Sequence, residues 1–161
     1  MNSPFRYNGL SKEQRDIAKA ADEFCLDKFC PRLKNRMIVR VIGKLGYLDR
    51  KLLYAECEYT DDSPEERYFR IHIDTDMGIY LFLETLMHEM VHVKQFAKGE
   101  MKDYIRTDNL VRWHKEKIDI FKTDYWDYPW EIEAHGRERG LVVQFKAKYP
   151  MWAEILEEYK E

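Results

Sequence analysis

The sequence has few of the features that mark several large classes of protein. It has only three cysteines, none of them in a Cys-x-x-Cys pair, which disfavours a zinc finger or a disulfide framework and suits a reducing compartment. The longest apolar run, residues 79–83, is far too short to span a bilayer. The N-terminus lacks the apolar core of a signal peptide. These absences predict a cytoplasmic protein without a membrane partner.

An excess of positive charge is also missing. The 161 residues carry 27 basic and 30 acidic side chains, for a net charge of −3, whereas nucleic-acid-binding domains are usually strongly basic. We therefore expect no dedicated nucleic-acid partner. A local basic cluster is interpreted as a solvated face, a DNA-facing role being the alternative: Lys28, Arg32, Lys34 and Arg36. Hydrophobic residues make up 45%, enough for one core, so we predict a single domain over residues 1–161.

The most informative segment is His-Glu-Met-Val-His at residues 88–92. Residues four apart lie on one face of a helix, so His88 and His92 can direct both imidazoles at one metal ion, with Glu89 beside a bound water. The surrounding stretch 78–97 lacks proline and internal glycine and is dense in leucine and methionine, which predicts a long buried helix. The alternative is a pair of hydrogen-bonded core histidines, which would be costly to bury without a metal.

A catalytic zinc needs a third protein ligand, and a later segment offers candidates. Pro129 is typical of the first turn of a helix, with Asp127 as a candidate cap, so a second helix is predicted over about 129–148. Glu131 and Glu133 are two residues apart and face different directions on a helix, so only one should reach the metal. Four side chains remain open as the third ligand: Asp127, Glu131, Glu133 and His135.

The two segments together resemble the zincin metallopeptidases of the broad gluzincin-like group. The pieces HEMVHVKQ (88–95) and DYWDYPWEIEAHG (124–136) are most similar to short metallopeptidase-like proteins of phages, and also resemble SprT-like and ImmA/IrrE-like small zincins. The similarity covers about residues 70–147. It implies Glu133, which precedes Ala134, as the third ligand of Zn²⁺, with His135 as runner-up. The second motif differs from that of thermolysin-type enzymes, and the third histidine of metzincins is absent.

This resemblance implies a zinc metallopeptidase that hydrolyses peptide bonds of a peptide or protein substrate. Glu89 would then act as general base towards the zinc-bound water. Such an enzyme would work in the cytoplasm of a bacterial cell or of a phage-infected host. One alternative is a zinc-binding sensor or protein-interaction domain of zincin fold with little or no proteolysis. A nucleic-acid-linked protease like the SprT-like group is a third hypothesis.

Several further side chains are candidates for supporting roles. An oxyanion that forms on the scissile carbonyl needs a nearby donor, for which the candidates are Tyr125, Tyr128, His114 and His135. Glu84, one turn before His88, could orient the outer nitrogen of a ligating histidine. The alternative for these residues is packing or ordinary surface charge.

The order of elements predicts an α+β fold of zincin type. A capping box of Ser11 and Gln14 predicts a helix over 12–30, and further elements are expected as strands over 37–44, 52–60 and 67–73, a hairpin near 110–121 and a helix over 151–160. Residues 1–10 are expected to be irregular. We predict a small antiparallel or mixed sheet of about three strands packed on the motif helix, flanked by an N-terminal helix and a C-terminal ligand helix. In zincins the strand before the motif helix commonly forms the sheet edge beside the cleft, so 67–73 is the expected edge strand, an interior strand being the alternative.

Overall fold

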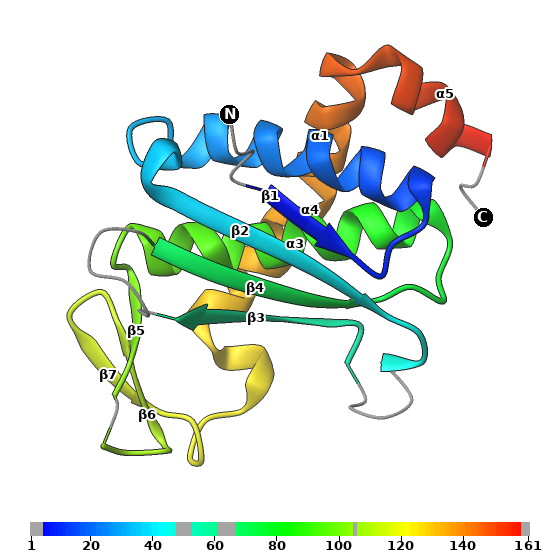
Figure 1. Cartoon of the computed structure of the whole chain (residues 1–161). Coiled ribbons are helices and arrows are strands. Elements are labelled where there is room, and N and C mark those ends of the chain that lie inside the picture. Colours follow the sequence, from blue (N-terminus) through cyan, green and yellow to red (C-terminus); the bar gives the residue numbers. More distant parts are fainter. Residues whose placement is uncertain (1–4, 48–52, 61–66, 105, 159–161) are drawn as a thin grey trace.

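The computed structural model describes residues 5–47, 53–60, 67–104 and 106–158, and these form an α+β fold. A four-stranded mixed sheet is covered on one face by helices, and a second, three-stranded sheet lies at one end of it (Figure 1). The strand order in the larger sheet is β1-β2-β4-β3, with bounds β1 (Phe5–Asn8), β2 (Met37–Lys44), β3 (Ala55–Thr60) and β4 (Arg67–Asp74). Strands β1, β2 and β4 are parallel, and β3 is antiparallel to β4.

The three strands expected in this sheet are confirmed, but two expectations about it are wrong. Residues 5–8, expected to be irregular, form β1, which pairs with β2 and makes the sheet four-stranded rather than about three-stranded. The segment Arg67–Asp74 is an interior strand because β2 and β3 flank it on both sides. The edge position therefore belongs to β3, whose far side has no neighbouring strand among the described residues.

The sheet face that packs on the helices follows the two-residue alternation of strands. Val39 and Val41 of β2 and Phe69, Ile71 and Ile73 of β4 are completely buried there. Within the described ranges the α-helices are α1 (Lys12–Phe29), α3 (Ile79–Ala97), α4 (Pro129–Lys148) and α5 (Pro150–Glu158). Both α1 and α3 lie behind the sheet in Figure 1, and α4 packs on α3. The capping box that starts α1 is present, as the sequence predicted.

Helix α3, which carries the His-Glu-Met-Val-His segment, lies between the sheet and α4. All its residues from Met87 to Ala97 are buried or half-buried. It ends at the predicted place, because Gly99 adopts a φ of +69° and its N–H donates to Phe96 O. Its N-cap residue is Gly78, without a capping side chain, and the nearby Asp74 accepts a bond from Asp76 N at the end of β4.

The smaller sheet follows α3 directly. Its antiparallel strands are β5 (Met101–Asp103), β6 (Leu110–Trp113) and β7 (Glu116–Asp119). The hairpin expected near 110–121 is thus confirmed. Met101, Val111 and Trp130 form a second hydrophobic cluster, apart from the main core. The described ranges also contain two short 3-10 helices, η1 (Lys34–Arg36) and η2 (Tyr125–Asp127). Within the described ranges, no helix is both long enough and apolar enough to cross a membrane.

Candidate metal centre

Three potential metal-binding side chains converge where the first turn of α4 meets the middle of α3. The Nε2 atoms of His88 and His92 are 3.1 Å apart. The carboxylate of Glu131 lies 3.2 Å from His88 Nε2 through Oε2 and 3.4 Å from His92 Nε2 through Oε1. One donor atom from each residue lies within 4.8 Å of the others. Two imidazoles and one carboxylate are the donor set of a mononuclear catalytic zinc site.

Glu133, the residue that the resemblance implied as third ligand, does not join this cluster, so its expected placement is corrected. Its carboxylate accepts bonds from Lys94 Nζ at 3.0 and 2.8 Å, from Gln95 Nε2 at 2.9 Å and from Arg137 Nε at 3.0 Å. The reason is the rotation of α4 about its axis. Trp130 and Ala134 are its buried residues at this level, and that orientation turns Glu131 to the histidines.

The other two candidate ligands are also accounted for. Asp127 lies exposed in η2. It was predicted to cap α4, but the N-cap residue of that helix is Tyr128. His135 lies close to His88, with ring centroids 4.5 Å apart, on the side where His88 turns its other nitrogen. It belongs to a neighbouring group with His88 and Glu138.

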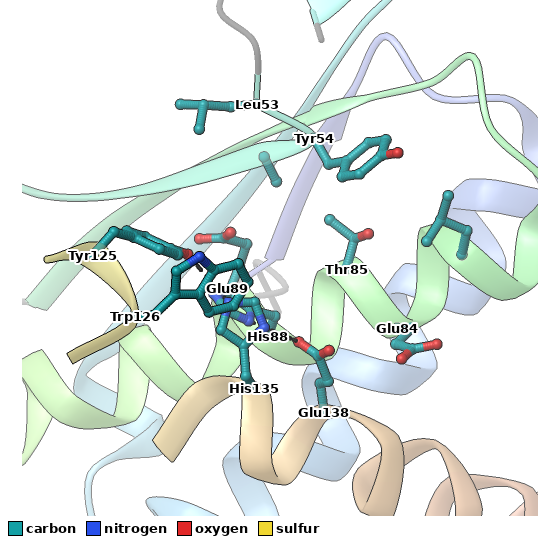
Figure 2. Close-up of a pocket in the computed structure, with 12 residues that line it drawn as sticks. Leu53, Tyr54, Glu84, Thr85, His88, Glu89, Tyr125, Trp126, His135 and Glu138 are labelled. Atoms are coloured by element: carbon teal, nitrogen blue, oxygen red, sulfur yellow. Dashed lines mark hydrogen bonds and ion pairs between the residues drawn. The ribbon is translucent and has the colours of Figure 1, made fainter. Parts of the chain in front are cut away.

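The outer nitrogen of each histidine is held by a hydrogen-bond partner. His88 Nδ1 lies 2.8 Å from Glu138 Oε2, and His92 Nδ1 lies 2.8 Å from Gln95 Oε1. An N–H at each Nδ1 leaves the lone pair of Nε2 facing the cluster, which is how ligating histidines are commonly oriented. The sequence prediction gave this orienting role to Glu84. In the structure Glu138 makes this contact, and Figure 2 shows Glu84 one turn earlier on α3, apart from the His88 ring.

Glu138 and Gln95 were both missed by sequence reasoning, although each has a sequence signal. Glu138 follows Glu131 by seven residues and so lies on the same helix face two turns later. Gln95 follows His92 by three residues on α3, which also places the two side chains together.

A buried network extends behind His92. Gln95 Nε2 donates to Trp130 O at 3.0 Å and to Glu133, so the amide that holds His92 is itself fixed by α4. Lys94, only 6% exposed, lies between Glu133 and Glu100, each 2.8 Å from Nζ. Burial alone would raise the pKa of Glu133, but its bonds to Lys94 and Gln95 lower that pKa to about 2. Glu133 is thus an ionised carboxylate that contacts Gln95, which in turn contacts His92.

The electrostatics of the cluster favour a cation. Burial alone would lower the pKa of His88, but hydrogen bonds to Glu131 and Glu138 raise it to about 10. The pKa of His92 is raised too, since its bond to Glu131 outweighs its burial. Burial would raise the pKa of Glu131, yet its bonds to both histidines hold it well below its usual value. A divalent cation would take the place of the Nε2 protons, and the same carboxylates that stabilise positive charge on the imidazoles would stabilise the charge of the cation.

Glu89 is a buried carboxylate that lines the same cavities as His88. It is only 5% exposed, and its Oε2 has no hydrogen-bond partner among the described residues. Burial raises the pKa of this carboxyl, and the two histidines oppose the rise. It lines both cavities described below, so the buried carboxylate borders the space that a substrate would enter.

The predicted oxyanion donors fall in different places. Tyr125 OH donates to Glu131 Oε2 at 2.8 Å and lies 3.2 Å from His135 Nε2, next to the cluster. Tyr128 OH instead donates to Ile120 O at 2.8 Å, which ties it to the smaller sheet. His114 has a φ of +52° in the turn after β6 and packs against Trp113, outside the His88–His92–Glu131 group.

Two adjoining cavities border the histidines, and both are lined by His88, Glu89 and Tyr125. The first, of about 460 Å³, borders His88 and His135 and is overhung by Tyr125 and Trp126 (Figure 2). The second, of about 320 Å³, borders His92 and Glu131. Ala55, the first residue of β3, and Leu53, two residues before it, also line both. An extended chain lying beside β3 would therefore pass over the cluster.

No known family model, curated protein or solved structure matches this chain. The case for a function therefore depends on the site itself. The convergent donors, the fixed outer nitrogens and the cation-favouring electrostatics all fit Zn²⁺ at His88, His92 and Glu131.

Proposed function

We propose that the chain is a zinc-dependent metallopeptidase of zincin type, in which His88, His92 and Glu131 hold Zn²⁺. The observation that carries the proposal is the convergence of these three donors beside the buried carboxylate of Glu89. One oxygen of that carboxylate, Oε2, has no hydrogen-bond partner among the described residues. When bound, zinc lowers the pKa of a water molecule and polarises a carbonyl group.

In this proposal Glu89 moves the proton. It takes a proton from the attacking water as the oxygen bonds to the scissile carbonyl carbon. It then returns the proton to the amine nitrogen as the C–N bond breaks. Burial suits Glu89 to this role, because a raised pKa makes a carboxylate a better proton acceptor near neutral pH. Tyr125, whose hydroxyl group lies at the cluster and donates to Glu131 in this structure, is the proposed donor to the developing oxyanion once its proton turns from Glu131 to the substrate.

The edge strand β3 supports a peptide as the substrate. Its outer edge carries backbone N–H and C=O groups that have no strand partner among the described residues, and an extended peptide can add to such an edge through main-chain hydrogen bonds. Ala55 and Cys57 of β3 line the cavity beside His92, so a peptide paired there lies across the reactive groups. This is the role that the sequence prediction gave to residues 67–73.

The test compares the unaltered protein with Glu89→Gln and His88→Ala, each measured for zinc content and for cleavage of a casein-like protein. We expect Glu89→Gln to keep zinc and to lose cleavage by about 10²- to 10⁴-fold, the usual contribution of a general base. His88→Ala should lose both zinc and cleavage. A zinc-loaded unaltered protein that cleaves nothing would overturn the peptidase proposal and favour a zinc-binding interaction domain.

A further inference from the structure

We infer that the cavity beside His92 and Glu131 is a pocket for a bulky apolar side chain of the substrate. This inference rests on the proposed function for the reaction and adds the class of residue that the enzyme selects. The cavity has a volume of about 320 Å³. Its walls are mostly apolar, with Phe96 from α3, Met101 and Val111 from the smaller sheet, and Tyr128 and Trp130 at the start of α4.

The floor of this pocket is a hydrophobic cluster of its own. Met101, Val111 and Trp130 form the second hydrophobic cluster, which is separate from the main core and is walled by strands β5 and β6. Each of the three is less than 9% exposed, so the floor is packed before any ligand arrives. Such a preformed apolar surface gains free energy by excluding water from a second apolar group.

Hydrogen bonds fix the walls around this floor. Tyr128 OH donates to Ile120 O at 2.8 Å, which joins the start of α4 to the end of the smaller sheet. Gln95 Nε2 donates to Trp130 O at 3.0 Å, which joins α3 to the same turn of α4. The rings of Tyr128 and Trp130 are stacked with centroids 4.8 Å apart. Because Gln95 also holds His92, the pocket wall and the metal centre share one support.

The position of β3 decides which part of a peptide enters the pocket. Ala55 and Cys57, alternate residues of the edge strand, face the pocket with small side chains and leave its mouth open. In a peptide paired with β3, every second side chain points the same way, and one of them meets the pocket beside the reactive groups. The lining also includes the carboxylates Glu56 and Asp103, which repel an acidic side chain.

The larger cavity, beside His88 and His135, also has an apolar lining, but that lining is not packed in advance. Its large apolar side chains, among them Leu81 and Trp126, are exposed, and Glu84, Thr85 and Glu138 lie beside them. The stronger apolar preference is therefore expected at the substrate position that meets the cavity beside His92.

The experiment measures binding rather than cleavage, in full-length Glu89→Gln supplied with zinc. The probes are fluorescent peptides of one parent sequence in which each position in turn is Leu, Phe, Ala, Asp or Lys. At one position, Leu or Phe should bind about tenfold or more tightly than Ala, the usual discrimination of an apolar pocket, and Asp should bind most weakly. Val111→Trp, added to Glu89→Gln, fills the pocket and should remove the preference for Leu and Phe.

Two further variants separate pocket filling from unfolding. Val143→Trp makes the same substitution on the outer face of α4, where Val143 is 62% exposed, and should leave the preference unchanged. Ile120→Ala enlarges the pocket and should raise the binding of Phe relative to Leu. This variant keeps the test intact where Val111→Trp fails to fold, as judged by circular dichroism.

The outcomes distinguish the pocket from the peptidase activity. Selective binding that is lost in Val111→Trp, together with an unaltered protein that cleaves none of the peptides, would support the pocket and overturn the peptidase. Cleavage by the unaltered protein without an apolar preference in binding would overturn the pocket alone. A preference for Lys, no measurable binding, or a preference that is the same in Val111→Trp and Ile120→Ala would also overturn the pocket.

Discussion

Replacing Glu133 by alanine should cost stability and leave the metal in place. Glu133 makes two contacts with Lys94 Nζ, whose side chain is 8% exposed, and one with Gln95. Removing one partner of a fully buried ion pair costs about 3–5 kcal/mol. The Glu133 side chain is 20% exposed and Lys94 keeps Glu100, so we expect a smaller loss of about 2–3 kcal/mol in the free energy of unfolding.

Urea unfolding of the metal-free protein measures this loss without a contribution from zinc. The matched control is Arg137→Ala, which removes an exposed contact of the same carboxylate and should cost at most about 1 kcal/mol. In a double-mutant cycle, Lys94→Met should cost less stability in the Glu133→Ala background than in the unaltered protein, because the contact between Lys94 and Glu133 is then already absent. Unchanged stability together with complete loss of zinc in Glu133→Ala would refute this reasoning and restore Glu133 as a ligand.

Further predictions concern pH, backbone geometry and metal removal. Burial raises the pKa of Asp22 to about 8, against about 4 when unfolded, so its contribution to stability is complete below pH 4 and is lost as pH rises through 8. Asp22→Asn should make the melting temperature vary less between pH 5 and 9. Gly9→Ala should lower the free energy of unfolding, because Gly9 has a φ of +69° and an added Cβ would lie 2.4 Å from Gly43 O. Gly140→Ala, where an added Cβ on α4 meets open space, should raise the free energy of unfolding by about 0.5–1 kcal/mol, and urea unfolding measures both variants. A chelator should lower the melting temperature of the zinc-loaded protein, and added zinc should restore it.

Local signals in the sequence were sufficient for the helices. The Ser11–Gln14 capping box starts α1, and Pro129 begins α4 at its first position. The spacing of His88 and His92 on a proline-free stretch was enough to place both rings together. In each case the decisive contacts lie within one or two helical turns, where periodicity carries the information.

The third metal-binding side chain depends on contacts that the sequence does not encode locally. Glu131 and Glu133 lie on the same turn of α4, and only the packing of Trp130 and Ala134 fixes which of them faces the histidines. The buried cation Lys94 then takes the other carboxylate. A rotation of α4 about its axis would exchange the two roles without changing any sequence pattern.

The order of strands in the larger sheet could not be predicted from local sequence patterns either. The segment Phe5–Asn8 is too short to show a clear alternation, and its pairing with β2 joins residues more than thirty positions apart. For the same reason, β4 could be identified as a strand but not as an interior one, since that depends on whether β2 and β3 flank it. The edge beside the cleft was therefore assigned to the wrong strand.

The most direct test of the account is the zinc content of two variants, Glu131→Gln and Glu133→Gln, which change carboxylates two positions apart on α4. They are purified beside the unaltered protein and His88→Ala. We predict one zinc ion per chain in the unaltered protein and in Glu133→Gln, and a loss of zinc in His88→Ala and Glu131→Gln. Retention of zinc in Glu131→Gln with loss in Glu133→Gln, or an unaltered protein that binds no zinc, would contradict the proposed site.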